Sequence, residues 1–185
     1  MIIETARLRL RCWQVADRQA FALMNAHAEV MHDLGGPISR EQSDAKLDRC
    51  ADAFERHGFG RLVIESLAGD SHGDPGGLPD GPQHPLGPHH EIGWRLVRDA
   101  WGRGYATEAA GAALDDAFIR AKLPQVVAYT APDNVRSQAV MARLGLRRDA
   151  SRDFTAVHDG FGSWRGLVWA ANPDWKASLS VTKGG

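Results

Sequence analysis

The chain has 185 residues, of which 43% are hydrophobic, 24% charged and 8% aromatic. This length suits one domain of ordinary size, and the apolar share is enough to bury a core. The 22 lysine and arginine residues balance 23 aspartate and glutamate residues, so the formal charge is −1. Such a balance argues against a nucleic-acid-binding protein, which needs a basic face to neutralise phosphates.

Cysteine content and the N-terminal sequence predict a cytoplasmic protein. Cys12 and Cys50 are too few for a disulfide framework, and we expect both to be small apolar groups kept reduced. Glu4 and Arg7 interrupt the place where a secretory signal would have its apolar run. No stretch approaches the about 18 apolar residues that span a bilayer, so no membrane partner is expected.

The first third of the chain predicts two strands and two helices. Strict alternation of basic and apolar residues is typical of a strand with one buried face. Ser39 and Gln42 form a capping-box pattern, and Gly58 is placed to end the helix that they begin. The expected elements, in chain order, are a strand at 7–13, a helix at 17–31, a helix at 39–58 and a short strand at 61–66.

The next stretch, residues 68–90, differs in composition. Of its 23 residues 11 are glycine or proline, so burial cannot offset the entropy of ordering it, and we expect a mobile loop. A third strand of the sheet is then short or missing. Four histidines lie here, and a metal site is conceivable, but their spacing matches no known site, so a solvated loop without metal is favoured. These histidines are His72, His84, His89 and His90.

The second half alternates strands and helices, which favours an α/β fold. Asp133 or Asn134 can cap the second helix, and Gly145 is placed to end it in a left-handed conformation. The expected elements are a strand at 91–97, a helix after the glycine-rich residues 101–104, a strand at 125–130, a helix at 133–144, and a closing hairpin or arm from 146–154 and 163–170.

A glycine-rich turn runs from the strand at 91–97 straight into a helix. Unpaired amides and the positive dipole end at a helix N-terminus form an anion site, and Gly102 and Gly104 let the backbone approach the anion. Arg103 adds charge, and Thr107 can donate a hydroxyl. The turn lacks both the G-x-G-x-x-G and the Walker pattern. The residues alone leave two interpretations open, a phosphate site and a tight turn without ligand.

Two motifs at this spacing resemble the GNAT N-acetyltransferase superfamily. The first is WGRGYATEA, from Trp101, and the second is N-x-x-S-x-x-V-M-x-R-L-G-L, from Asn134. The segments TARLRLRCW and EIGWRL and the pair Asp153-Phe154 are similar to the ribosomal-protein-alanine N-acetyltransferase (RimJ/RimL-like) branch. The resemblance implies a mixed, mostly antiparallel central sheet with a splayed strand pair and helices on both faces. It implies one domain over residues 1–175 and a flexible tail at 176–185.

The same resemblance implies where acetyl-CoA binds. The cosubstrate would lie in the splay between residues 91–97 and 125–130, with the main chain of Leu96 and Val97 bonding its pantetheine. Asn134 and Ser137 would face the pantetheine and the thioester. The diphosphate would rest on the turn and the helix start, formed by Trp101, Gly102, Arg103, Gly104, Tyr105, Ala106 and Thr107.

The reaction implied is transfer of the acetyl group to a primary amine in a ternary complex, without a metal. Glu91 is the candidate base, although it can also be a strand-edge glutamate pairing Arg95. Ser137 is the candidate acid, although it can also be only a hydrogen-bond partner of CoA. Many relatives have a tyrosine where this chain has Met141, which cannot donate a proton. The acceptor is a protein N-terminus or a small-molecule amine, and the protein a monomer or homodimer.

Two other functions stay open at this point. A protein of the same fold can bind acyl-CoA as a sensor or regulatory subunit with weak or no turnover, which the methionine at position 141 favours. A nucleotide-binding protein can use the glycine-rich turn, although no ribose-recognition element is apparent.

Overall fold

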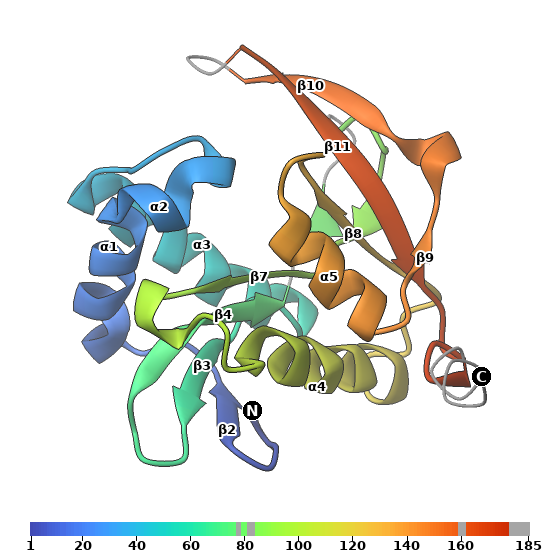
Figure 1. Cartoon of the computed structure of the whole chain (residues 1–185). Coiled ribbons are helices and arrows are strands. Elements are labelled where there is room, and N and C mark those ends of the chain that lie inside the picture. Colours follow the sequence, from blue (N-terminus) through green and yellow to red (C-terminus); the bar gives the residue numbers. More distant parts are fainter. Residues whose placement is uncertain (77–78, 81–83, 159–161, 178–185) are drawn as a thin grey trace. The chain divides into compact units, whose positions relative to one another are not determined.

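The computed structural model describes residues 1–76, 79–80, 84–158 and 162–177, which fall into two compact units (Figure 1). The first unit is made of residues 1–78 and 93–113, and the second of residues 79–92 and 114–185. Helix α4 (Tyr105–Ile119) begins in the first and ends in the second. A single domain over residues 1–175 stays a prediction, and residues 178–185 of the expected tail lie outside the described part.

The first unit is built on a five-stranded antiparallel sheet in the order β1-β2-β3-β4-β7. Figure 1 shows β2, β3, β4 and β7 as neighbouring arrows. Strand β7 is therefore the last strand of this sheet. The elements are β1 (Ile2–Glu4), β2 (Leu8–Arg11), α1 (Arg18–Ala26), α2 (Ala28–Met31), α3 (Arg40–His57), β3 (Val63–Ser66), β4 (Ser71–Gly76) and β7 (Gly93–Leu96).

Capping side chains and backbone conformation set the ends of the helices in this unit. The capping box that opens α3 is confirmed, since the Ser39 hydroxyl accepts from the amide of Gln42 at 3.2 Å and the Gln42 side chain accepts from the amide of Ser39 at 2.9 Å. Gly58 ends α3 with a φ of 71°. The single helix expected at 17–31 is wrong, because His27 has extended backbone that ends α1, and its ring then caps α2.

Strand β4 corrects the expectation of a loop over residues 68–90. It has six residues and pairs with both β3 and β7, so the third strand is present. Its sequence shows no apolar alternation. The strand is held in the sheet by the close approach of the backbone at Gly73 and by the ion pair between Asp74 and Arg95. A Cβ at Gly73 would lie 1.9 Å from the carbonyl oxygen of Arg95, and Asp74 lies directly opposite Arg95 in the register.

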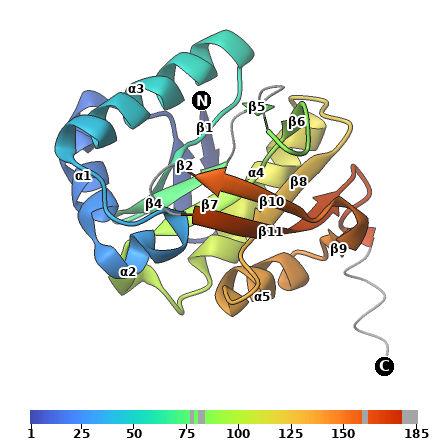
Figure 2. The same ribbon diagram turned by 90° about the horizontal axis from the view of Figure 1, so that it is seen from above.

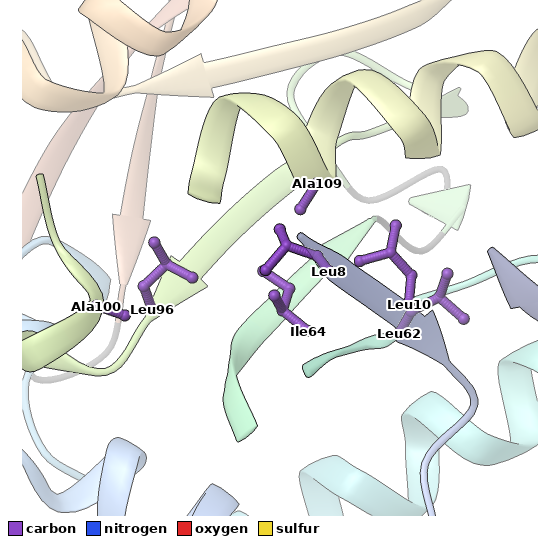
Figure 3. Close-up of a cluster of buried hydrophobic side chains, with 7 residues drawn as sticks. All are labelled: Leu8, Leu10, Leu62, Ile64, Leu96, Ala100 and Ala109. Atoms are coloured by element: carbon purple, nitrogen blue, oxygen red, sulfur yellow. The ribbon is translucent and has the colours of Figure 1, made fainter. Parts of the chain in front are cut away.

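One face of the first sheet forms an apolar core with the start of α4 (Figure 3). Alternate residues of the strands point to it, as the sequence pattern predicts. Ala109 is fully buried on the helix side, and its small side chain lets α4 pack closely on the strands. The core therefore fixes the direction of α4. Its buried members are Leu8, Leu10, Leu62, Ile64, Leu96, Ala100 and Ala109.

The opposite face carries a buried hydrogen-bonded network that we call the polar layer, formed by Asn25, Ser43, Asp74 and Arg95. The Arg95 guanidinium donates to Asp74 at 2.8 Å and to the Asn25 side-chain oxygen at 2.6 Å. Asn25 in turn donates to the Ser43 hydroxyl at 2.8 Å. The layer joins α1 and α3 to β4 and β7, and all four residues are buried.

Lys46, a half-buried residue of α3, lies close to this layer. Its pKa is lowered from 10.5 to about 8, mainly by burial and to a smaller extent by the positive charges of Arg95 and Arg61. The folded state therefore binds this proton more weakly than the unfolded state does. Replacing Lys46 with methionine is expected to raise the free energy of unfolding at pH 7 by about 1 to 3 kcal/mol.

The pH dependence gives the test. Between pH 8 and 10.5 the unfolded wild type holds more protons than the folded one, so its stability rises with pH through that window. Urea unfolding at pH 7 and at pH 9.5 should show the advantage of Lys46→Met shrinking at the higher pH. Lys122→Met, at an exposed site, is the matched control. If Lys46→Met raises the free energy of unfolding equally at both pH values, the stability gain does not come from removing a buried charge.

The second unit contains a three-stranded antiparallel array in the order β10-β11-β8, with β9 also pairing with β11. A closing hairpin is present, with its second arm as expected, but its first arm is β10 rather than residues 146–154, of which only β9 pairs with β11. Figure 2 shows β10 and β11 side by side. Strand β8 is an end strand of this array. The elements are β5 (Pro79–Asp80), β6 (His89–His90), β8 (Val126–Thr130), α5 (Val135–Arg143), β9 (Arg147–Arg148), β10 (Phe154–His158) and β11 (Gly162–Ala171).

His84 and His89, from the histidine-rich segment, pack against aromatic rings, and with them form what we call the aromatic cluster. The expectation that these histidines are solvated is wrong for His84 and His89, because ring packing holds them. Within the described residues no group of three metal-binding side chains is found, and the His72 side chain lies outside them. No described helix is long and apolar enough to cross a membrane. The cluster consists of His84, His89, Tyr129, Phe154 and Trp164.

Candidate functional site

The turn before α4 has the geometry of an anion site. Gly102 and Gly104 have φ angles of 75° and 80°, in the left-handed region that favours glycine. The amide of Glu108 makes a helical bond to the carbonyl of Gly104. Helix geometry leaves the amides of Ala106 and Thr107, in the first turn, without a carbonyl acceptor from within the helix. Residues 102–104 are exposed, and a Cβ at Gly102 would meet nothing within 4 Å, so a ligand can approach the backbone of the turn.

Trp101 ties this turn to the end of β7. Its indole nitrogen donates to the carbonyl oxygen of Leu96 at 3.0 Å, and the Arg98 guanidinium lies 4.8 Å above its ring centre. The Leu96 carbonyl, expected to bond pantetheine, therefore already accepts one hydrogen bond from within the chain. Because β7 is the last strand of its sheet, its outer edge is suited to the strand-like bonding predicted for Leu96 and Val97.

Arg7 and Glu108 clamp the turn from the side, and sequence reasoning missed Arg7. The Arg7 guanidinium donates to the carbonyl of Arg103 at 2.9 Å and to Glu108 at 2.7 Å. The Thr5 hydroxyl donates to the same carboxylate at 2.6 Å. No local pattern could reveal this clamp, because about a hundred residues separate its two sides in the sequence.

Glu108 holds the clamp as a carboxylate. Burial raises its pKa, but the bonds from Thr5 and Arg7 lower it further, so the pKa lies below its ordinary value. We expect Glu108→Gln to lower the free energy of unfolding by about 1 to 2 kcal/mol at pH 7. The contribution is present above the ordinary glutamate pKa and lost as the pH falls through the lowered value.

Urea unfolding at pH 7 and pH 3 measures this contribution. The difference between wild type and Glu108→Gln should be largest at pH 7 and should shrink in acid. Glu55→Gln, an exposed glutamate on α3, is the matched control and should be near neutral. A loss in Glu108→Gln no larger than in the control would show that the clamp does not support this end of α4.

Glu91, the candidate base, belongs to the second unit. It forms a parallel bridge with Val127 of β8, closed by a bond from the Ile92 amide to the Val127 carbonyl at 2.7 Å. Residues paired across a ladder direct their side chains to the same face, and side chains alternate along a strand. Glu91 therefore shares a face of β8 with Val127 and Tyr129. Arg95, its alternative partner, is bonded to Asp74 and Asn25.

Asn134 and Ser137 open α5. The Asn134 side-chain oxygen accepts from the Ser137 amide at 3.0 Å, so Asn134 is the helix cap that the sequence predicted as one of two choices. Within the described part of the chain the Ser137 hydroxyl makes no hydrogen bond, which leaves it available to a ligand. Met141 is 2% exposed and part of the core, so it cannot replace a proton-donating tyrosine.

The predicted site residues thus form two sets. Leu96, Val97, Trp101 and residues 102–107 are brought together in the first unit. Glu91, Asn134 and Ser137 belong to the second unit.

Comparison with known proteins agrees with the motifs. The family model described as an acetyltransferase (GNAT) domain matches residues 7–147. YnaD of Bacillus subtilis, named as an uncharacterized N-acetyltransferase, is 39% identical over 60 residues, which are 32% of this chain and 35% of YnaD. The matched stretch thus spans about a third of that relative.

Solved structures show the same fold over nearly the whole chain. An acetyltransferase from Agrobacterium tumefaciens is 31% identical with a TM-score of 0.77, covering 93% of this chain and 94% of its own. The ribosomal-protein acetyltransferase RimL, solved in complex with coenzyme A, is 15% identical with a TM-score of 0.73, covering 93% of this chain and 98% of its own. The expected GNAT fold is confirmed, and this chain belongs to the GNAT acetyltransferases, a family of acyltransferases.

Proposed function

We propose that this protein transfers an acetyl group from acetyl-CoA to a primary amine by direct attack in a ternary complex. The acceptor is a protein N-terminus or a small-molecule amine. The observation that carries the proposal is the exposed turn at Gly102–Gly104, whose amides open α4 and suit a diphosphate. Family membership and the coenzyme A bound to RimL, a protein of the same fold, support it.

The first unit supplies the cosubstrate-binding groups in this proposal. Amides from Gly102 to Thr107 bind the diphosphate, with Arg103 adding charge beside it. Main-chain groups of Leu96 and Val97 bond the pantetheine, and Trp101 holds the Leu96 carbonyl in place. Arg7 keeps the turn in shape through the carbonyl of Arg103.

The second unit supplies the proton-transfer groups. An alkyl amine is mostly protonated at pH 7 and must lose a proton before it can attack a thioester. Glu91 accepts that proton, directly or through water. The amine nitrogen then bonds to the acetyl carbon and the carbon–sulfur bond breaks. Ser137 gives its proton to the leaving thiolate and takes back the second proton that the amine nitrogen loses as the amide forms, directly or through water. The unbonded hydroxyl of Ser137 supports this role.

A second candidate is acyl-CoA binding with weak or no turnover. The buried Met141, at the place where many relatives have a tyrosine, favours it, because the helix then offers only Ser137 as acid. For both candidates we propose a cytoplasmic monomer or homodimer. The free state of Cys12 and Cys50 supports the location.

Thermal unfolding with added ligands and thiol release with added amines test the proposal. Acetyl-CoA and CoA are expected to raise Tm, whereas pantetheine, which lacks the diphosphate, raises it much less. Equal stabilisation by ATP or NAD would favour a nucleotide-binding protein instead. Thiol release with members of an amine and peptide panel supports transfer, and tight CoA binding without release across the panel supports the sensor.

A further inference from the structure

Tyr129 is the centre of the aromatic cluster. Its ring centre lies 5.3 Å from that of His84, 5.2 Å from Phe154, 6.0 Å from His89 and 6.1 Å from Trp164. The rings of His89, Phe154 and Trp164 meet it edge-on, whereas His84 is stacked on it. Each of the five residues is half-buried.

Strand register places the cluster on one side of the second unit's sheet. Tyr129 pairs with Val168 on β11, and Phe154 pairs with Gly166, two residues before Val168. Because side chains alternate along strands, the Tyr129 and Phe154 rings share a face. A Cβ at Gly166 would lie 2.5 Å from the Phe154 ring, so this glycine lets the ring lie across β11.

Glu91 is directed to the same face. It pairs with Val127, which lies two residues before Tyr129 on β8. His89 lies two residues before Glu91, and its ring belongs to the cluster. The candidate base therefore shares a face of β8 with the Tyr129 ring at the centre of the cluster, within the second unit.

We propose that the aromatic cluster recognises the acceptor, and that this protein prefers primary amines that carry an aromatic ring. The inference rests on the proposed acetyl transfer with Glu91 as base. Half-buried aromatic rings bind another aromatic ring edge-to-face, and the face of such a ring attracts an ammonium group before it is deprotonated. A small arylalkylamine and a peptide with an N-terminal phenylalanine share this chemistry.

Thiol release with paired amines tests the preference. 2-Phenylethylamine and 2-cyclohexylethylamine have similar size but differ in aromaticity, and peptides that begin with phenylalanine or leucine form the second pair. Wild-type kcat/KM should favour the aromatic member of at least one pair by about 5- to 10-fold. The pair that shows the preference identifies the source of the amine.

Variants locate the preference in the cluster. Tyr129→Leu and Phe154→Leu should bring the ratio close to one, mainly by raising KM for the aromatic member. Phe59→Leu, the same kind of change in the first unit, should leave the ratio as in wild type. Calorimetry of 2-phenylethylamine binding to the CoA-saturated protein gives a second readout that needs no turnover, and the same two variants should weaken it.

The outcomes separate this inference from the proposed function. Thiol release with equal rates for both members of each pair overturns the inference and leaves acetyl transfer standing. A preference that survives in both cluster variants also overturns it. Loss of 2-phenylethylamine binding in the variants, without thiol release from any amine, supports the recognition site and counts against transfer.

Discussion

Asp74→Ala is expected to lower the free energy of unfolding by about 3 to 5 kcal/mol, because it leaves the buried charge of Arg95 without its carboxylate. Asp74 is completely buried, and its oxygen lies 2.8 Å from Arg95 and 3.6 Å from Arg61. Urea unfolding measures the loss. Asp48→Ala, which removes a 56% exposed carboxylate paired with Arg18, is the matched control and should cost less than about 1 kcal/mol.

A second variant separates loss of charge from loss of shape. The double change Asp74→Leu with Arg95→Met removes both charges together, and most of the stability should return, because the guanidinium no longer needs a partner. If Asp74→Ala alone unfolds the protein, a folded double variant would still show that the unpaired charge of Arg95 caused the loss of stability. An Asp74→Ala protein as stable as the Asp48→Ala control would show that the polar layer does not hold the sheet to its helices.

Glu91→Gln should lower kcat by about 10²- to 10³-fold, because an amide cannot take the proton from the amine. The thiol-release assay measures this as a function of pH. Wild type should lose activity as the pH falls and the carboxylate becomes protonated, whereas the residual activity of the variant should follow only the deprotonation of the amine itself. Tm shifts with acetyl-CoA should be alike in both proteins.

Two comparisons complete that experiment. Glu55→Gln, on the exposed side of α3, should keep the wild-type kcat and pH profile. Ser137→Ala should lower kcat without weakening CoA binding if its hydroxyl protonates the thiolate, and should raise the Kd for CoA if it is only a hydrogen-bond partner. A Glu91→Gln enzyme with wild-type kcat would remove this residue from the proposed mechanism.

Features set by neighbouring residues were predictable from the sequence, and features set by distant ones were not. Ser39 and Gln42 cap each other within one turn, and Gly102 and Gly104 take the left-handed backbone that their turn requires. Strand β4 was missed because its pairing depends on a carboxylate opposite Arg95, twenty-one residues away, rather than on apolar alternation.

The histidine-rich segment shows the same limit. Its glycine and proline content predicted a solvated loop, yet the segment contains strand β4, and His84 and His89 pack against Tyr129, a residue of another strand. Composition describes what a segment lacks, and it carries no information about rings that approach from elsewhere in the chain. The base candidate Glu91 was recognisable by its motif, whereas its place beside those rings required the strand register.

The bond from Arg7 to the carbonyl of Arg103 ties the segment before β2 to the turn that we propose binds the cosubstrate. Expression clones that begin downstream of Arg7, or proteases that trim the amino end, will disturb the cosubstrate Kd although the removed peptide lies far from it in the sequence.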